Sequence, residues 1–549
     1  MLWGNVPRYD QELYLHAMSQ YTGFFDIIAN SISFNRSVYE DTSVNSLLFR
    51  PALYLQLGTF LYLFGHNFFL WQFASLVLHI ATVLALYAVF MQGRLQHTTY
   101  PLLISALFGC SFVAAELVLW HHISGYSTFC LLTTLSVLFL IKFFTRRNSI
   151  YGVLALFSAM LAQFMYELGV IFNLMLVTVF LYMFFFEKDY ISNQSKHFLV
   201  WPVLFFCSAA LYPVLSVTDF LLRDVSVVTN SFNVTAEGQA NFSPSQSKTS
   251  LIEKIVLGNW NAIQQIPFWL GGLMVPAIYE FEAYHRTLFS GFRISGWLVV
   301  VNAITILIML FLFFPMLKKY RSCFAKDQVS QWLLVFSGFL LLYTYLFIIS
   351  AGRTYGAGIP YIFVNTHYAY IPQLIFLITM SFLFIKKTEH VKSPCCENHA
   401  ATWKILLSVL VMLNGYHTYQ VAKSYHYDYS LSKIAVFEAV ESWAQDNKQK
   451  PDMYFKVSED CVANHEIHWF SPGYFRRYSG WQSGPVTVAD ALWSKKSFIL
   501  NEGYLTGTDY VLSEIPCPQE AILSEEQKSR DKALHKTLWE LIVGKDFVE

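Results

Sequence analysis

The sequence predicts a polytopic α-helical membrane protein with about ten transmembrane helices. Of its 549 residues, 55% are hydrophobic and only 13% are charged. Soluble domains carry about 25% charged residues, so this composition excludes an ordinary soluble fold. The second observation is a series of apolar segments, each close to the roughly 20 residues that a helix needs to cross a bilayer. The formal net charge is zero and there is no basic arm, so nothing in the charge pattern indicates a nucleic-acid partner.

Ten segments are the candidates for these helices. They lie near residues 70–92, 101–117, 124–145, 150–166, 168–186, 198–217, 294–317, 331–350, 368–385 and 403–421. Basic residues follow every second segment, at Arg94, Arg146, Lys188, Lys319 and Lys387. Such residues collect on the cytoplasmic side of a membrane, which assigns these ends to the cytoplasm. The outer face then holds residues 1–69, the 116–123 turn, the 218–293 loop, the 351–367 loop and residues 422–549.

These positions divide the chain into three parts. Residues 1–69 form an outer first loop with a surface helix, residues 70–421 form the transmembrane domain, and residues 422–549 form a domain outside the membrane. The polar start contains neither a signal peptide nor a span, although the topology places it outside. We therefore expect one further helix before it; the alternative is a polar start that is translocated unaided.

The outer segments differ in composition. Residues 225–250 are rich in Ser, Asn and Thr, as in a mobile segment, and residues 251–290 have the alternation expected of interfacial helices that gate entry of a lipid. Residues 422–549 are mixed and charged, and their strand-like runs are "DMYFKVSED" and "KSFILNEGY". They predict a small α+β domain, in which a Cys461–Cys517 disulfide is an option because that compartment is oxidising.

Two carboxylates sit at apolar helix ends on the outer face. Glu116 lies in "AAELVLWHHISGYS" at the end of the second span, and Glu167 lies in "FMYELGV" between the fourth and fifth spans. A charge next to hydrocarbon is costly, so this arrangement predicts a functional site at the outer surface. The alternative is that both are solvated interfacial residues. His79, within the first span, is interpreted as a hydrogen-bonded packing histidine.

Three stretches resemble motifs of the GT-C glycosyltransferases. The nearest branch contains the protein O-mannosyltransferases and the transmembrane, tetratricopeptide-repeat O-mannosyltransferases. The resembling stretches are "FRPALYLQLGTFLYLFGHNFFLWQFASLVLHIATVLALY" (49–87), "FGCSFVAAELVLWHHISGYSTFCLLTTLSVLFL" and "LLAQFMYELGVIFNLMLVTVFLY". They carry the family's arginine-proline pair as Arg50-Pro51 and its acidic residues as Glu116 and Glu167. The resemblance implies a GT-C-like transmembrane fold.

The chain also departs from this family. Tyr126 lies near the place of an arginine, Tyr166 stands where a lysine is common, and His367 in "THYAYIPQLIFL" stands where an arginine is usual. Residues 422–549 show no 34-residue repeat. Contacts to the donor headgroup are therefore expected to differ from those of the family.

The resemblance implies an inverting transferase that moves a sugar from a polyprenyl-phosphate donor to a protein or glycan hydroxyl outside the cytoplasm. Such a reaction needs a carboxylate base for the hydroxyl proton. The family places its base in the first outer loop, where "RYDQELYLH" offers Asp10 first and Glu12 second. Glu116 would orient the acceptor. The candidates for substrate binding are Arg50, Glu167, His121, His122, Arg353 and His367, of which Arg353 lies in the glycine-rich "SAGRTYGAGIP".

No cofactor is expected. A divalent metal held by Glu116, His121 and His122 is the less favoured alternative, because adjacent histidines seldom bind one ion. Two other functions stay open: a ligase or polymerase of lipid-linked glycans, and a transporter or flippase of the same lipids. Transporters usually have repeated halves with broken helices at mid-membrane, and the sequence shows no such symmetry. A bacterial plasma membrane is the expected location, with the endoplasmic reticulum as the alternative.

Cysteines at Ser231 and Thr388 test the predicted topology. The charge pattern places these positions on opposite sides, so an impermeant thiol reagent added to sealed membranes should label Ser231→Cys from outside only. Thr388→Cys should react only after the membranes are opened, in a background without accessible native cysteines. Labelling of both positions from the same side would contradict the orientation.

Overall fold

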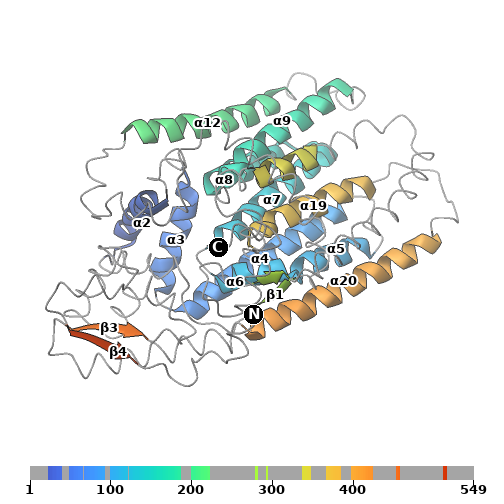
Figure 1. Ribbon diagram of the computed structural model, residues 1–549. Helices are drawn as coiled ribbons and strands as arrows, with labels where there is room; N and C mark the ends of the chain where they lie inside the picture. The colour runs from blue at the N-terminus through green and yellow to red at the C-terminus, as the bar shows by residue number, and fades with distance from the viewer. Residues whose placement is uncertain are drawn as a thin grey trace, which may run out of the picture.

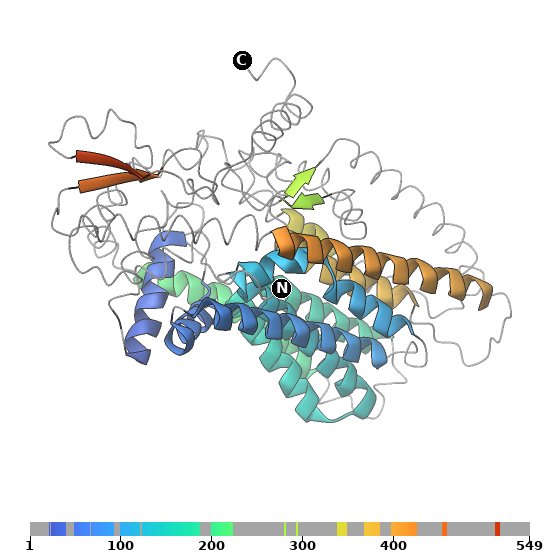
Figure 2. The ribbon, with the colours of Figure 1, turned by 90° about the horizontal axis from the view of Figure 1, so that it is seen from below.

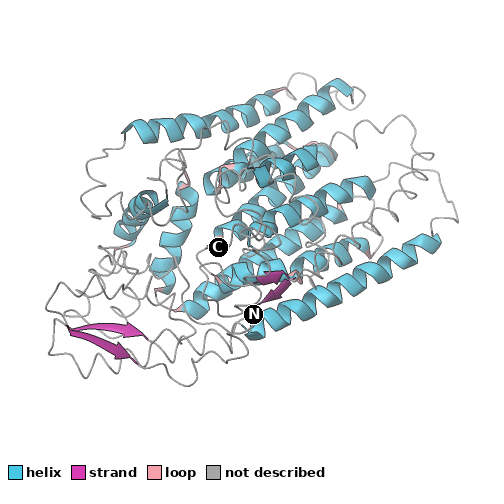
Figure 3. Ribbon diagram, in the orientation of Figure 1, coloured by secondary structure: helices cyan, strands magenta, loops and turns pink. Residues whose placement is uncertain are grey.

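A computed structural model describes part of the chain. The described residues are 21, 23–39, 49–65, 67–92, 99–120, 123–186, 199–222, 279–281, 292–294, 337–347, 367–384, 397–424, 453–457 and 511–515. Helices dominate these residues, and two short strand pairs complete them (Figure 3).

Most helices run side by side in one bundle (Figure 1 and Figure 2). Its members are α4 (Phe68–Met91), α5 (Tyr100–Gly109), α6 (Phe112–Leu119), α7 (Gly125–Arg146), α8 (Ser149–Met165), α9 (Leu168–Phe186), α12 (Val200–Leu222), α19 (His367–Phe384), α20 (Glu397–Ser424) and the helix Ser337–Phe347. In Figure 1, α12 and α20 lie at opposite edges. A pair of helices, α2 (Phe24–Tyr39) and α3 (Pro51–Phe64), packs beside the bundle, and α3 runs across the direction of the bundle helices.

Three described helices are long and apolar enough to cross a membrane. They are α4, α7 and the Val200–Asp219 part of α12, and α5 with α6 would make a fourth span if the bent pair is counted as one. They coincide with predicted spans near 70–92, 124–145, 198–217 and 101–117. The predicted count of about ten stays a prediction, since most of 294–317 lies outside the described residues.

The distribution of polar residues on α4 identifies lipid as the surrounding solvent. Its buried side carries a polar series, Gln72, Ser75, His79 and Thr82. Its outward side carries Val77, Ile80 and Leu84, which are 46%, 47% and 61% exposed. A helix at a water-facing surface has the reverse pattern, whereas helices in lipid place polar groups against one another. The chain is therefore an α-helical membrane protein.

The second predicted span is broken rather than continuous. α5 and α6 meet at an angle of 52° around Gly109–Ser111. Backbone groups freed within a bilayer need partners from the protein. The Gly109 carbonyl lies 3.1 Å from Nε2 of His79, and the Cys110 carbonyl accepts a hydrogen bond of 2.8 Å from Oγ1 of Thr418 on α20. Side chains of two other helices thus satisfy the break.

His79 joins three helices through this contact. Because Nε2 donates to Gly109, Nδ1 is the acceptor, and it lies 2.8 Å from the hydroxyl of Tyr370 on α19. The ring is 3% exposed. This confirms the interpretation of His79 as a hydrogen-bonded packing residue.

The strands lie in the segments outside the bundle. β1 (Tyr279–Phe281) pairs antiparallel with β2 (Phe292–Ile294), and β3 (Met453–Val457) pairs in parallel with β4 (Val511–Ile515). β3 confirms the strand expected in "DMYFKVSED", whereas the expectation of helix is wrong at 279–281. The run at 496–504, Cys461 and Cys517 lie outside the described residues. α12 continues to Leu222 and α20 to Ser424.

His79→Leu should destabilise the bundle. It leaves the Tyr370 hydroxyl and the Gly109 carbonyl without their histidine partner, and interhelical hydrogen bonds in membranes contribute about 0.6–2 kcal/mol each. Thermal unfolding of purified protein in detergent should show a lower midpoint, while Leu84→Ala, on the outward side of the same helix, should change it little. An unchanged midpoint in His79→Leu would show that the histidine does not hold the break.

Candidate functional site

An ion pair joins the start of α3 to the turn between α8 and α9. Nε of Arg50 donates to Oε2 of Glu167 at 2.9 Å, and Nη2 donates to Oε1 at 2.8 Å. The two side chains are 13% and 28% exposed, so solvent screens the pair only in part. A two-point contact of this kind fixes the plane of the guanidinium as well as its position.

Tyrosines surround this pair. The Arg50 guanidinium lies over the ring of Tyr166, 4.9 Å from its centroid, which is a cation–π contact. The ring of Tyr126 packs against the ring of Tyr166, with the centroids 4.7 Å apart and an interplanar angle of 32°. The ring of Tyr368 makes an edge contact with Tyr126, with the centroids 6.4 Å apart. Tyr126 and Tyr166 are two of the three positions, with His367, at which the chain departs from cations of the resembling family. Here they form the aromatic support of a single arginine.

Local packing sets the position of Arg50. Pro51 occupies the first turn of α3, where its missing N–H leaves no unpaired donor. Gln56, on the next turn, donates to Oγ of Ser124 at 3.0 Å and thereby ties α3 to the start of α7. Gly125 then lies so close to α3 that an added Cβ would be 2.4 Å from Cδ1 of Leu53 and 3.1 Å from the Tyr166 hydroxyl. A larger residue at this position would force the side chain of Leu53 to move where these three segments meet.

A buried amide network sets the position of Glu167. Nδ2 of Asn173 on α9 donates to Oε1 of Gln163 on α8 at 3.1 Å, and Nε2 of Gln163 donates to the Ser208 carbonyl of α12 at 2.9 Å. At Gly169 an added Cβ would lie 2.3 Å from Cα of Gln163, so α8 and α9 are in backbone contact just after the turn. The turn that carries Glu167 is consequently held by three helices.

The electrostatics keep Arg50 charged. Burial alone would lower the pKa of Arg50, but the nearby Glu167 carboxylate, with contributions from Tyr54 and Tyr166, raises the pKa well above its usual value. A guanidinium has five N–H donors, and the contact with Glu167 uses Nε and Nη2. In the part of the chain that the structure describes, Nη1 makes no hydrogen bond. Arg50 therefore keeps donors for an anionic or oxygen-rich group.

An apolar cavity begins beside this cluster. It has a volume of about 220 Å³ and lies between α7, α9, α19 and the helix Ser337–Phe347. Along α7 its lining runs from Phe129 to Phe144, and along α9 from Leu168 to Met183, which at 1.5 Å per residue is a length of about 22 Å. Its described lining contains no charged side chain. Leu168 directly follows Glu167, so one end of the cavity lies at the ion pair.

The structure brings together two of the predicted site residues, Arg50 and Glu167. Glu116 lies within α6, and His367 begins α19, but only their backbone positions are described. The remaining predicted residues lie outside the described ranges: Asp10, Glu12, His121, His122 and Arg353. Sequence reasoning missed Gln56, Ser124 and Tyr368. Gln56 had a detectable signal, since it is a polar residue within the first two turns of a largely apolar helix.

The described side chains include no group of three His, Cys, Asp or Glu that could hold a metal ion, and the alternative set at Glu116, His121 and His122 is not among them. Comparison of the sequence with models of known protein families gives no match, and neither does comparison with curated proteins.

Removing one partner of the Arg50–Glu167 pair should cost more stability than removing both. Glu167→Met leaves a partly buried guanidinium without its counter-charge, at an expected cost of about 1–3 kcal/mol. In the double variant with Arg50→Met, no charge is left behind, so its unfolding midpoint should lie nearer to that of the wild type. Arg146→Met, exposed at the other end of α7, is the control. Strictly additive losses would contradict the pairing.

Proposed function

We propose that the chain is an integral membrane glycosyltransferase that moves a sugar from a polyprenyl-phosphate donor to a hydroxyl of a protein or glycan acceptor on the non-cytoplasmic face. One observation carries the proposal. Arg50 comes from the first stretch that resembles the GT-C enzymes, Tyr126 from the second and Tyr166 with Glu167 from the third, and these residues are in direct contact. Residues from all three stretches thus meet at one point, which supports the proposal.

The chemistry of the cluster suits the leaving group of this reaction. As the sugar is transferred with inversion, negative charge builds up on the departing lipid phosphate, and positioned N–H donors stabilise such charge. Arg50 has unused donors, and Glu167 holds the guanidinium in a fixed plane. In this proposal Arg50 contacts the phosphate, and Glu167 is a positioning residue that acts through Arg50.

The acid–base part of the mechanism rests on the sequence. Asp10 is the proposed base that accepts the proton of the attacking hydroxyl, Glu12 is the second choice, and Glu116 orients the acceptor. Arg353, His367, His121 and His122 are the proposed further contacts to donor and acceptor. The proposed site faces the outside of a bacterial plasma membrane, with the endoplasmic reticulum membrane as the alternative.

One observation favours a transporter or flippase of lipid-linked glycans instead. The break between α5 and α6 is a feature of transporters, whose broken helices offer free backbone groups to substrates. Here, however, the carbonyls of Gly109 and Cys110 are already bound by His79 and Thr418. This break therefore favours a structural role, and the transferase remains the preferred proposal.

Carboxylate variants test the transferase directly. Glu116→Gln and Asp10→Asn should each lower sugar transfer by about 10²–10⁴-fold, because they remove an orienting group or a proton acceptor while keeping the side-chain shape. Asp224→Asn, in the segment of the outer loop that follows α12, should be near neutral. The measurement is transfer of radiolabelled sugar from a panel of polyprenyl-phosphate donors by purified protein. Full activity in Glu116→Gln and Asp10→Asn would reject these assignments, and movement of labelled lipid across proteoliposomes without transfer would favour the flippase.

A further inference from the structure

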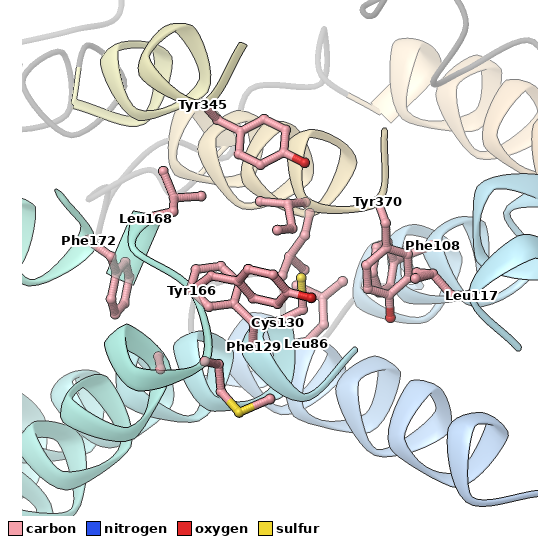
Figure 4. Packing of buried hydrophobic residues seen from close by; sticks show 14 of the residues in the cluster. Leu86, Phe108, Leu117, Phe129, Cys130, Tyr166, Leu168, Phe172, Tyr345 and Tyr370 are labelled. Atoms are coloured by element: carbon pink, nitrogen blue, oxygen red, sulfur yellow. The ribbon is translucent and has the colours of Figure 1, made fainter. Parts of the chain in front are cut away.

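The hydroxyl of Tyr345 is a buried donor without an acceptor. Tyr345 is 4% exposed, and among the described residues its hydroxyl has no hydrogen-bond partner. Figure 4 shows its ring projecting from the helix Ser337–Phe347 on the side of the cluster that holds Tyr166, Cys130 and Leu168. A buried hydroxyl without a partner is costly. Its presence here is explained if a molecule that binds at this point supplies the acceptor.

The same face of this helix lines the apolar cavity. Gly338 and Leu341 contribute to the cavity wall, and Tyr345 follows them at the spacing of three and four residues that keeps side chains on one helix face. Gly338 lies against α19, since an added Cβ would be 2.1 Å from Oγ1 of Thr379. This face of the helix Ser337–Phe347 therefore contacts α19 at one end of the cavity through Gly338. Tyr345, on the same face, lies toward the other end.

Tyr345 lies at the end of the cavity that is nearest to the ion pair. In Figure 4 its ring lies on the side of the cluster that holds Tyr166 and Leu168, the two residues that flank Glu167 in the sequence. Arg50, with its unused Nη1 group, is bound to Glu167 and stacked on Tyr166. Hydrogen-bond donors thus gather at one end of the cavity, and hydrocarbon side chains line its length. This arrangement matches an amphiphile with an anionic head.

The size of the cavity selects among amphiphiles. Its volume of about 220 Å³ is below the range of roughly 300–1,000 Å³ typical of drug-sized ligands, whereas its lining extends for about 22 Å along α7. A long and narrow space accepts one hydrocarbon chain. A phospholipid has two chains, and a prenyl phosphate has one.

We propose that Tyr345 donates a hydrogen bond to a phosphate oxygen of a polyprenyl phosphate whose chain occupies the cavity between α7, α9, α19 and the helix Ser337–Phe347. This inference rests on the proposed function and adds to it a headgroup ligand and a place for the chain. Tyr345 thereby favours donors with a phosphate at the end of the chain, and the cavity excludes two-chain lipids.

Binding of farnesyl phosphate and of farnesol to the purified protein tests the inference. Leu341→Trp fills the cavity and should weaken binding of both probes at least about 10-fold, whereas Leu340→Trp, on the exposed side of the same helix, should change neither. Tyr345→Phe should weaken farnesyl phosphate about 10-fold and farnesol little, because only the hydrogen bond to the charged head is lost. Tyr416→Phe, at an exposed tyrosine of α20, is its control.

Folding and lipid class need separate controls. The thermal unfolding midpoint of each variant is compared with that of the wild type to show that the variant folds. If Leu341→Trp does not fold, Ile375→Phe is used instead, because it fills the same cavity from α19. Wild-type binding of farnesyl phosphate by a folded cavity-filling variant, or by Tyr345→Phe, would overturn the proposal. Phosphatidic acid that competes as well as farnesyl phosphate would also overturn it and would indicate an ordinary phospholipid site.

The outcomes separate this inference from the proposed function. If the probes bind as expected but no donor supports sugar transfer, the lipid site stands and the transferase proposal fails. If a folded Leu341→Trp variant transfers sugar at the wild-type rate, the transferase proposal stands and the lipid site fails.

Discussion

The lack of water in the hydrocarbon core is the constraint on which this structure depends. A polar group that enters the bundle is costly unless it finds a partner in the protein or in a bound molecule. The broken second span survives because His79 and Thr418 bind its freed carbonyls. The turn between α8 and α9 is held for the same reason by Asn173 and Gln163, whose amides have no water to bind. Buried polar side chains therefore fix how the helices pack, and this packing presents Arg50 to Glu167.

The candidate site combines this constraint with a second one. A partly buried guanidinium is stabilised by a counter-charge, and Glu167 supplies it through two hydrogen bonds. Because the two charges of the pair cancel, neutral tyrosine rings can pack around it and no additional charged residue is needed to balance it. What remains for a ligand is a set of oriented donors beside an apolar cavity. Such a site would discriminate by shape and hydrogen bonding more than by attraction over distance.

Much of the helical layout was predictable, because apolar length and basic ends depend on the local sequence. Arg50 and Glu167 were both candidates from the sequence, but their pairing was not predicted. The bend at Gly109–Ser111 was not predictable, since no proline marks it and its partners come from α4 and α20. The unpaired hydroxyl of Tyr345 was equally hidden, because it depends on which helices surround that end of the cavity. The pairing of β1 with β2 was also not predictable, because it depends on contacts between two separate short segments.

The two hydrogen bonds at the break in the second span can form at different times during synthesis of the chain. His79 is 30 residues away from Gly109 along the chain, so both are present soon after the second span is made. Thr418 is 308 residues away from Cys110. At about 5–20 residues per second, the ribosome needs roughly 15–60 s to supply it. During that interval the Cys110 carbonyl lacks its final partner, and a chain that stops before α20 never gains it. Completion of the bend is thus a late event in biogenesis and depends on α20, the last helix among the described residues.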